Sequence, residues 1–257
     1  MNPPISGHSR NGLARELPHM GIHSVDDADA PLILLPGMGA DARMFAPLRS
    51  TLPQLVTPVW IEPERGESLV AYARRLAKVV DPGRSCFVGG ASVGGVVAME
   101  VAAALPSARA CFLIGSMRSP DGLPWRLKAL RPLTPLTCLL PWFTWLIPPL
   151  VGAAFGPFAR DIAQQLADAD AKFMRWASHA VLSWKPSLKV ADVRVFQIHG
   201  DHDRVLPIGR TRPDCIVRGA GHVLSVTHPT ATSEFLLAGM KSVAQLRLEL
   251  AMGRGEF

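Results

Sequence analysis

Residues 85–104 read SCFVGGASVGGVVAMEVAAA, and this stretch decides the fold expected for the chain. The apolar run Cys86–Val88 is typical of a buried strand. It leads into a glycine-rich turn with the pattern G-x-S-x-G, in which the serine is Ser92. An alanine-rich run without proline follows and predicts a helix. The stretch therefore predicts strand, tight turn and helix, with Ser92 in the turn.

The glycines of this turn have a steric reason. A serine between a strand and a helix sits in strained backbone, and neighbours without side chains let the two elements approach each other. The free N–H groups and positive dipole end of the helix then face any negative charge formed near Ser92. Because the chain has 22 glycines, the pattern alone is a weak signal, and it is the flanking strand and helix that give it weight.

Length and composition indicate one globular α/β domain. A chain of 257 residues with 48% hydrophobic and 19% charged residues can bury a single large core. Its net charge of +6 comes without a basic run or a basic stripe interleaved with aromatics, so we expect no nucleic-acid partner. The polar N-terminus does not resemble a signal peptide, which predicts a cytoplasmic protein. Four cysteines show no paired spacing and are interpreted as small hydrophobic residues: Cys86, Cys111, Cys138 and Cys215.

Strands and helices are expected to alternate along the chain. The predicted strands are 31–36, 56–61, 86–88, 110–114, 193–198 and 214–217. The predicted helices are 42–52 with Asp41 as its N-cap, 67–80, the helix after Ser92, and one from 229 onward. This order predicts an α/β fold with a mostly parallel twisted sheet flanked by helices, whose ligands lie beyond the carboxyl ends of the strands. The predicted organisation is a flexible tail at 1–30, a core at 31–116 and 191–257, and a helical cap at 117–190, called the cap segment below.

The cap segment is rich in tryptophan and in positive charge. It holds five of the six tryptophans, and residues 132–159 carry no charge at all. Prolines divide that uncharged run into pieces too short to span a bilayer. We interpret the segment as an apolar lining over Ser92, with Trp125, Trp142 and Trp145 as predicted substrate-binding residues, although such side chains more often serve packing. The alternative is a surface for peripheral membrane contact, since basic residues accompany the tryptophans.

Ser92 has candidate catalytic partners farther along the chain. A serine hydroxyl needs a base to take its proton, and the base needs a third group to orient it. Asp203 and His222 each follow a predicted strand, which gives the order Ser, Asp, His. Asp201 is the rival acid and His228 the rival base. The histidines and aspartates of 199–203 also suggest a metal site, which we disfavour because no further ligands cluster elsewhere.

Four segments carry a resemblance to a known family. LILLPGMGAD (32–41), GGASVGGVV (89–97), IHGDHDRVLP (198–207) and GAGH (219–222) are similar to the oxyanion loop, nucleophile elbow, acid loop and histidine loop of α/β-hydrolase-fold serine hydrolases. The resemblance favours Asp203, which stands three residues after a glycine. It implies oxyanion-hole N–H groups from Met38 and Val93. The chain departs from the family at Pro36–Gly37, where His-Gly is common, and in lacking the first antiparallel strands, which predicts a smaller sheet.

The resemblance and the motifs lead to an expected activity. We expect a serine hydrolase without cofactor or metal that cleaves a carboxylic ester with a lipophilic acyl or alcohol part through an acyl-enzyme. Thioester hydrolysis, on acyl-CoA or acyl-carrier substrates, is the close alternative. A non-catalytic binding protein on a hydrolase scaffold is the alternative from another class. Non-hydrolytic members of the fold, namely cofactor-free haloperoxidases and C–C bond lyases, use similar residues and are a further alternative. Epoxide hydrolases and haloalkane dehalogenases of this fold need an aspartate where this chain has Ser92, so both activities are excluded.

Overall fold

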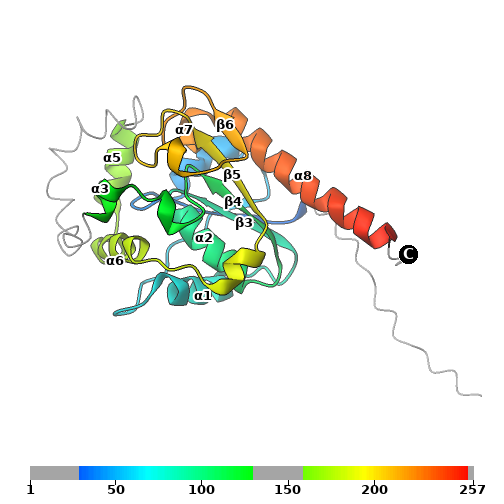
Figure 1. The fold of residues 1–257 in the computed structure, drawn as a ribbon, viewed down its shortest axis with the longest axis horizontal. Coiled ribbons are helices and arrows are strands. Elements are labelled where there is room, and N and C mark those ends of the chain that lie inside the picture. The colour runs from blue at the N-terminus through cyan, green and yellow to red at the C-terminus, as the bar shows by residue number, and fades with distance from the viewer. Residues whose placement is uncertain (1–28, 130–158, 254–257) are drawn as a thin grey trace, which may run out of the picture.

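A six-stranded parallel sheet forms the centre of the protein. The computed structural model describes residues 29–129 and 159–253. The strand order is β2-β1-β3-β4-β5-β6, and every neighbouring pair is parallel. This architecture confirms the predicted fold class (Figure 1). The strands are β1 (Leu32–Leu35), β2 (Leu55–Val56), β3 (Cys86–Ala91), β4 (Ala108–Ile114), β5 (Val195–Gly200) and β6 (Cys215–Val217).

Helices cover both faces of the sheet. Alternate residues of β1 divide between two cores, with Ile33 and Leu35 on one face and Leu32 and Leu34 on the other. The first core packs under α1 (Leu69–Val80) and α2 (Val93–Ala104). The second packs under the 3-10 helix η2 (Ala42–Leu48), α7 (Leu224–Thr227) and α8 (Pro229–Gly253). All four residues of β1 are buried, which confirms the covered strand that its fully apolar sequence predicts.

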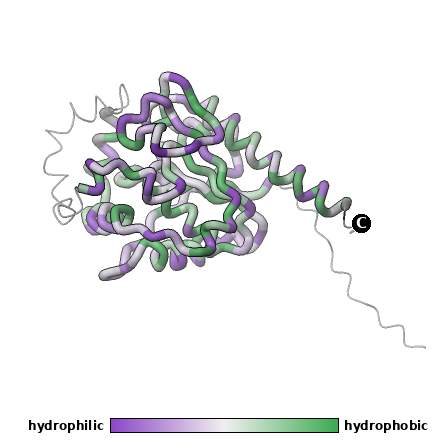
Figure 2. The backbone as a smooth tube through the Cα atoms, viewed as in Figure 1, coloured by the Kyte–Doolittle hydropathy of each residue, from purple (hydrophilic) through white to green (hydrophobic). Residues whose placement is uncertain are grey.

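The distal half of α8 extends beyond the sheet (Figure 1). Hydrophobic and hydrophilic residues alternate along it (Figure 2). Leu248 and Leu250 are both exposed there, whereas Leu236 and Met240, nearer its beginning, are buried. The helix therefore contributes to the core as far as Val243, which is also buried.

Two predicted elements are shorter than expected, and proline explains both. The segment predicted as a helix at 42–52 forms a 3-10 helix that ends at Leu48, with Pro47 inside it. Asp41 is its N-cap, as predicted, and accepts a hydrogen bond from the Arg43 N–H at 2.8 Å. Where a strand was predicted at 56–61, the structure has the two-residue strand β2 at Leu55–Val56, because Pro58 has no N–H to donate to a neighbouring strand.

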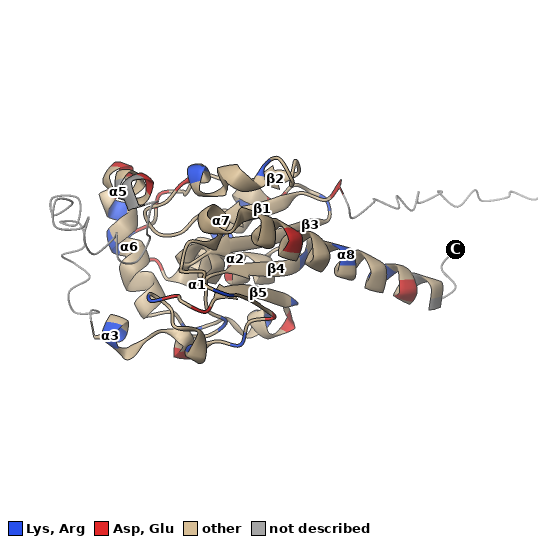
Figure 3. Ribbon diagram, turned by 90° about the horizontal axis from the view of Figure 1, so that it is seen from above, with Lys and Arg blue, Asp and Glu red and all other residues tan. Residues whose placement is uncertain are grey.

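The cap segment connects β4 to β5 and packs against α1 and α2. Its described helices are η3 (Pro120–Gly122), α3 (Trp125–Lys128), α5 (Ala159–Asp168), α6 (Ala171–Leu182) and η6 (Leu188–Asp192). Trp176 of α6 lies 4.1 Å from Tyr72 of α1, measured between ring centroids. The Trp184 indole N–H donates to the buried Glu100 carboxylate of α2 at 2.9 Å. Figure 3 shows α3, α5 and α6 together at one end of the molecule, opposite the projecting half of α8.

Parts of the predicted organisation lie outside the described residues. These are nearly all of the tail at 1–30 and the centre of the cap segment, with Trp142 and Trp145. Within residues 29–129 and 159–253, no helix combines the length and the apolar character needed to cross a membrane.

Candidate active site

Ser92 stands in the turn between β3 and α2 with strained backbone. Its φ of 51° and ψ of −123° make it the one described non-glycine residue with positive φ. The position of Gly94, two residues after Ser92, has no room for a side chain. A Cβ on Gly94 would lie 2.2 Å from the backbone oxygen of Pro36 and 2.3 Å from that of Leu35. The glycine thus lets the start of α2 approach the end of β1, which holds Ser92 beyond the carboxyl edge of the sheet.

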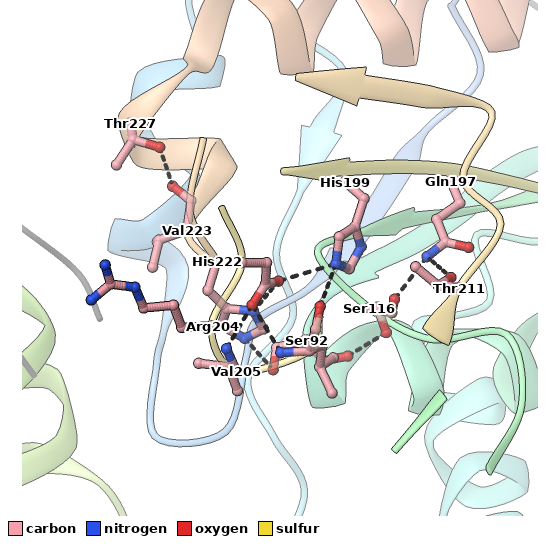
Figure 4. A network of polar contacts seen from close by, with 12 residues as sticks. Ser92, Ser116, Gln197, His199, Arg204, Val205, Thr211, His222, Val223 and Thr227 are labelled. Carbon is pink, nitrogen blue, oxygen red and sulfur yellow. Dashed lines mark hydrogen bonds and ion pairs between the residues drawn. The ribbon is translucent and has the colours of Figure 1, made fainter. Parts of the chain in front are cut away.

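The structure brings Ser92, His222 and Asp203 into one hydrogen-bonded chain (Figure 4). His222 Nε2 lies 2.9 Å from Ser92 Oγ, and His222 Nδ1 lies 2.7 Å from Asp203 Oδ2. Since the carboxylate can only accept, Nδ1 carries the proton and Nε2 is free to accept the hydroxyl proton of Ser92. His222 and Asp203 are buried, and Ser92 is half-buried. The arrangement supplies a hydroxyl, a base on that hydroxyl and an acid that orients the base.

Asp203 is held as a carboxylate by the loop that follows it. Its Oδ1 accepts from the backbone N–H groups of Val205 and Leu206, both at 2.8 Å. Burial alone would raise the pKa of Asp203, but hydrogen bonds from His199 and His222, with the attraction of His222, hold its pKa well below the ordinary value. The ionised form is therefore the form present at neutral pH.

The rival residues lie elsewhere. Asp201 Oδ1 accepts from the Gly219 N–H at 2.7 Å, so its carboxylate closes a turn rather than contacting His222. His228 Nδ1 lies 2.9 Å from the hydroxyl of its neighbour Thr227, next to the start of α8. Of the two candidate acids and the two candidate bases, Asp203 and His222 are the pair that hydrogen-bond to each other, and His222 also hydrogen-bonds to Ser92.

Close backbone contacts fix the position of His222. A Cβ on Gly200, the last residue of β5, would lie 2.2 Å from the backbone oxygen of Ala220 and 2.6 Å from that of Gly221. The loop after β6 therefore packs directly on the end of β5. This contact delivers His222 to the carboxyl edge of the sheet, where Ser92 already stands.

The predicted oxyanion-hole residues lie in two different turns of the structure. Val93 follows it as the first residue of α2, and Met38 lies in the turn after β1. Neither backbone N–H donates a hydrogen bond to another residue of the described part of the chain. The cap segment packs on this turn, because the Ser178 hydroxyl of α6 lies 3.4 Å from the Met38 sulfur. Gly37, the residue before Met38, lies close to the serine, because a Cβ on Gly37 would lie 3.6 Å from the Ser92 Cβ.

Ser116 and Gln197 support the elbow and were not predicted from the sequence. The Ser116 hydroxyl donates to the backbone oxygen of Ser92 at 2.6 Å, and the backbone oxygen of Ser116 accepts from Gln197 Nε2 at 2.8 Å. Gln197 is fully buried, and its Oε1 accepts from Arg118 at 3.0 Å. The position of Ser116, two residues after the end of the buried strand β4, was the signal available in the sequence.

The predicted substrate-binding tryptophans are only partly described. Trp125 lies in α3 and is 73% exposed, while Trp142 and Trp145 fall outside the described residues. A described cavity of about 540 Å³ borders the oxyanion loop at Pro36 and Gly39. Within the described ranges, no group of three or more His, Cys, Asp or Glu side chains is arranged to hold a metal ion.

Comparison with known proteins places the chain in a family. The model of the family described as "Alpha/beta hydrolase family" matches residues 32–235. The chain belongs to the alpha/beta hydrolase family. A comparison with curated protein sequences finds no match.

Solved structures share the fold of this family member at low sequence identity. A thermophilic esterase from Thermogutta terrifontis is 16% identical with a TM-score of 0.66, over 84% of this chain and 90% of that one. The esterase from Exiguobacterium antarcticum is 15% identical with a TM-score of 0.63, over 82% and 92%. The enol-lactonase from Burkholderia xenovorans LB400 is 16% identical with a TM-score of 0.62, over 81% and 90%. At such identities the likeness concerns the fold alone.

Proposed function

We propose that the protein is a serine hydrolase that cleaves a carboxylic ester with a lipophilic acyl or alcohol part. The observation that carries the proposal is the hydrogen-bonded chain from Ser92 Oγ through His222 to Asp203, at 2.9 and 2.7 Å. The strained backbone of Ser92 supports it further, because strain of this kind concentrates at functional sites. Structural neighbours named as esterases and an enol-lactonase are consistent with this chemistry.

The proposed reaction proceeds in two halves. Ser92 Oγ attacks the acyl carbon while His222 Nε2 takes the hydroxyl proton, and Asp203 stabilises the imidazolium that forms. The N–H groups of Val93 and Met38 bind the oxyanion, each donor contributing about 3 kcal/mol to the transition state. The bond from the carbonyl to the alcohol oxygen then breaks, and His222 gives its proton to the departing alcohol. Water repeats the sequence on the acyl-enzyme, which releases the acid and restores Ser92.

One observation favours thioesters as the second candidate substrate. A cavity of about 850 Å³ lies between the loop before α1 and helix α6. Its lining includes three glutamates, which are paired with Arg75 or Lys172, and three cations that form no ion pair with another described residue: Arg65, Arg175 and Lys185. Unpaired cations suit a phosphate-bearing leaving group such as that of an acyl-CoA.

A matched substrate panel tests the proposal and separates the two candidates. Wild type and Ser92→Ala would be assayed on p-nitrophenyl esters of increasing acyl length and on the corresponding acyl-CoAs, with kcat/KM measured for each. We expect turnover that depends on Ser92 and is higher for the esters. Higher kcat/KM on acyl-CoAs would assign a thioesterase. Equal rates for wild type and Ser92→Ala on every substrate would contradict the hydrolase and favour a binding protein on this scaffold.

The role proposed for the cap segment is a lipophilic lining over the site, with peripheral membrane contact as the alternative. Trp125, together with Arg126 and Lys128, is exposed on α3, which supports the membrane alternative. Flotation with liposomes distinguishes the two, with Trp125→Ser as the matched variant. Wild type absent from the lipid fraction would support the lining, and recovery that depends on Trp125 would support membrane contact.

A further inference from the structure

His199 is a buried histidine that the proposed reaction does not use. It lies near the end of β5, one residue before Gly200, and its side chain is fully shielded from solvent. Its Nε2 lies 2.7 Å from the backbone oxygen of Leu206 and 3.2 Å from Asp203 Oδ2. Its Nδ1 has no hydrogen-bond partner among the described residues. The His199 ring therefore contacts the same carboxylate oxygen of Asp203 that His222 contacts.

These contacts fix the tautomer of His199. Both atoms that face Nε2 are oxygens without protons, one a carbonyl and one a carboxylate. Nε2 must therefore carry the proton and share it between the two acceptors, which leaves Nδ1 with a lone pair and no donor. A phenylalanine would fill a similar volume without burying an unpaired nitrogen. Packing alone consequently does not explain a histidine at this position.

His199 contacts both ends of the loop 203–206. Leu206 is held at both of its backbone polar groups, since its N–H donates to Asp203 Oδ1 and its oxygen accepts from His199. Asp203 is held at both oxygens, with Oδ2 shared between His222 and His199. His199 thus ties the carboxylate and the loop that supports it to the rigid end of β5.

We propose that His199 is a positioning residue that orients Asp203 toward His222. The proposal rests on the proposed function, because it concerns the same Ser92, His222 and Asp203. When His222 becomes an imidazolium, the carboxylate must stay in line with its Nδ1. Without the contact to His199, the loop can turn Oδ2 away from His222. The stabilisation of the imidazolium is then lower in the transition state, whereas substrate binding is unchanged.

Three substitutions separate the hydrogen bond from the bulk of the ring. His199→Gln places an amide N–H near the position of Nε2. His199→Asn places its shorter amide near the position of Nδ1, too far to reach the same acceptors. His199→Leu has no hydrogen-bond donor. His202→Gln is the matched control, because His202 is the exposed neighbour of Asp203 and no hydrogen bond to its ring is present among the described residues. On a p-nitrophenyl ester we expect kcat to fall about tenfold in His199→Leu and His199→Asn with KM nearly unchanged, and to be restored within about twofold in His199→Gln.

A readout that does not depend on turnover accompanies the kinetics. The proton between His222 Nδ1 and Asp203 lies in a short charge-assisted hydrogen bond and should give a far-downfield proton resonance. We expect this resonance in wild type, His202→Gln and His199→Gln, and its shift or loss in His199→Asn. Wild-type kcat and an unshifted resonance in His199→Asn would overturn the proposal, as would equal losses in His199→Asn and His199→Gln. If His199→Leu does not fold, the comparison of His199→Asn with His199→Gln, in kcat and in the resonance, tests the proposal by itself.

Labelling of wild type with a fluorophosphonate separates this inference from the proposed function. If wild type is labelled at Ser92 and the His199 variants do not differ in kcat or in the resonance, only the positioning role is wrong. If wild type is not labelled, the hydrolase proposal fails, and the resonance in the Asn and Gln variants still decides whether His199 orients Asp203.

Discussion

Replacement of Asp203 by asparagine is the change whose effect the structure predicts in most detail. Oδ1 accepts from the N–H groups of Val205 and Leu206, so the amide oxygen of Asp203→Asn must occupy that side. The amide nitrogen then takes the place of Oδ2, 2.7 Å from His222 Nδ1. Its N–H donates to Nδ1 and moves the imidazole proton to Nε2, which faces Ser92. A protonated Nε2 cannot accept the serine proton.

The magnitude follows from that tautomer change. The same substitution in the Ser-His-Asp arrangement of a serine protease lowers kcat by about 10⁴-fold, which corresponds to about 5.4 kcal/mol. We expect a fall of this size in Asp203→Asn, measured as kcat on a p-nitrophenyl ester, with the circular dichroism spectrum unchanged.

Asp201→Asn is the matched control for this experiment. The carboxylate of Asp201 accepts only from the Gly219 N–H among the described residues, and an amide oxygen can accept the same bond. Its kcat should therefore remain within about twofold of wild type. The reasoning would be refuted if Asp203→Asn kept kcat within about tenfold of wild type. It would equally be refuted if Asp201→Asn were the more damaging change.

Three further predictions concern stability. Gly94→Ala should lower the free energy of unfolding by about 2–4 kcal/mol in urea titrations, because its Cβ would lie 2.2 Å from the Pro36 oxygen. Wild-type stability in this variant would contradict the close approach of α2 to the end of β1. The lowered pKa of Asp203 stabilises the fold above the ordinary carboxyl pKa of 3.8, and this contribution is lost as pH falls below it. Stability of Asp203→Asn should thus decline less than that of wild type on acidification, and parallel curves would be inconsistent with the shift. Trp184→Phe removes the donor to buried Glu100 and should cost about 1–3 kcal/mol, whereas an unchanged thermal midpoint would speak against that bond.

The sequence predicts most of the architecture because local patterns determine it. Fully apolar runs such as β1 can be buried on both faces only in a covered parallel sheet, and G-x-S-x-G places Ser92 between strand and helix. Predictions at element ends were less accurate. At η2 and β2 the competing effect was proline, which shortened a predicted helix and a predicted strand.

The supporting contacts of the site could not be predicted because they depend on strand register. Gln197 reaches Ser116 across 81 positions of sequence, since β4 and β5 pair with Leu113 opposite Gln197. His199 meets Asp203 only because the loop after β5 folds back over the strand end. No periodicity in a single strand reports which residue of its neighbour lies opposite. The sequence order of Ser92, Asp203 and His222 was informative because each follows a strand.

The most direct test of the central claim is peptide mass spectrometry of the protein after reaction with a fluorophosphonate. Ser92 Oγ, with His222 Nε2 at 2.9 Å, should be the atom that becomes phosphonylated. The predicted result is one adduct on the peptide that contains Ser92, absent in Ser92→Ala and strongly slowed in His222→Gln. Folded wild-type protein that stays unmodified, or that carries its adduct on another serine, would contradict the role proposed for Ser92.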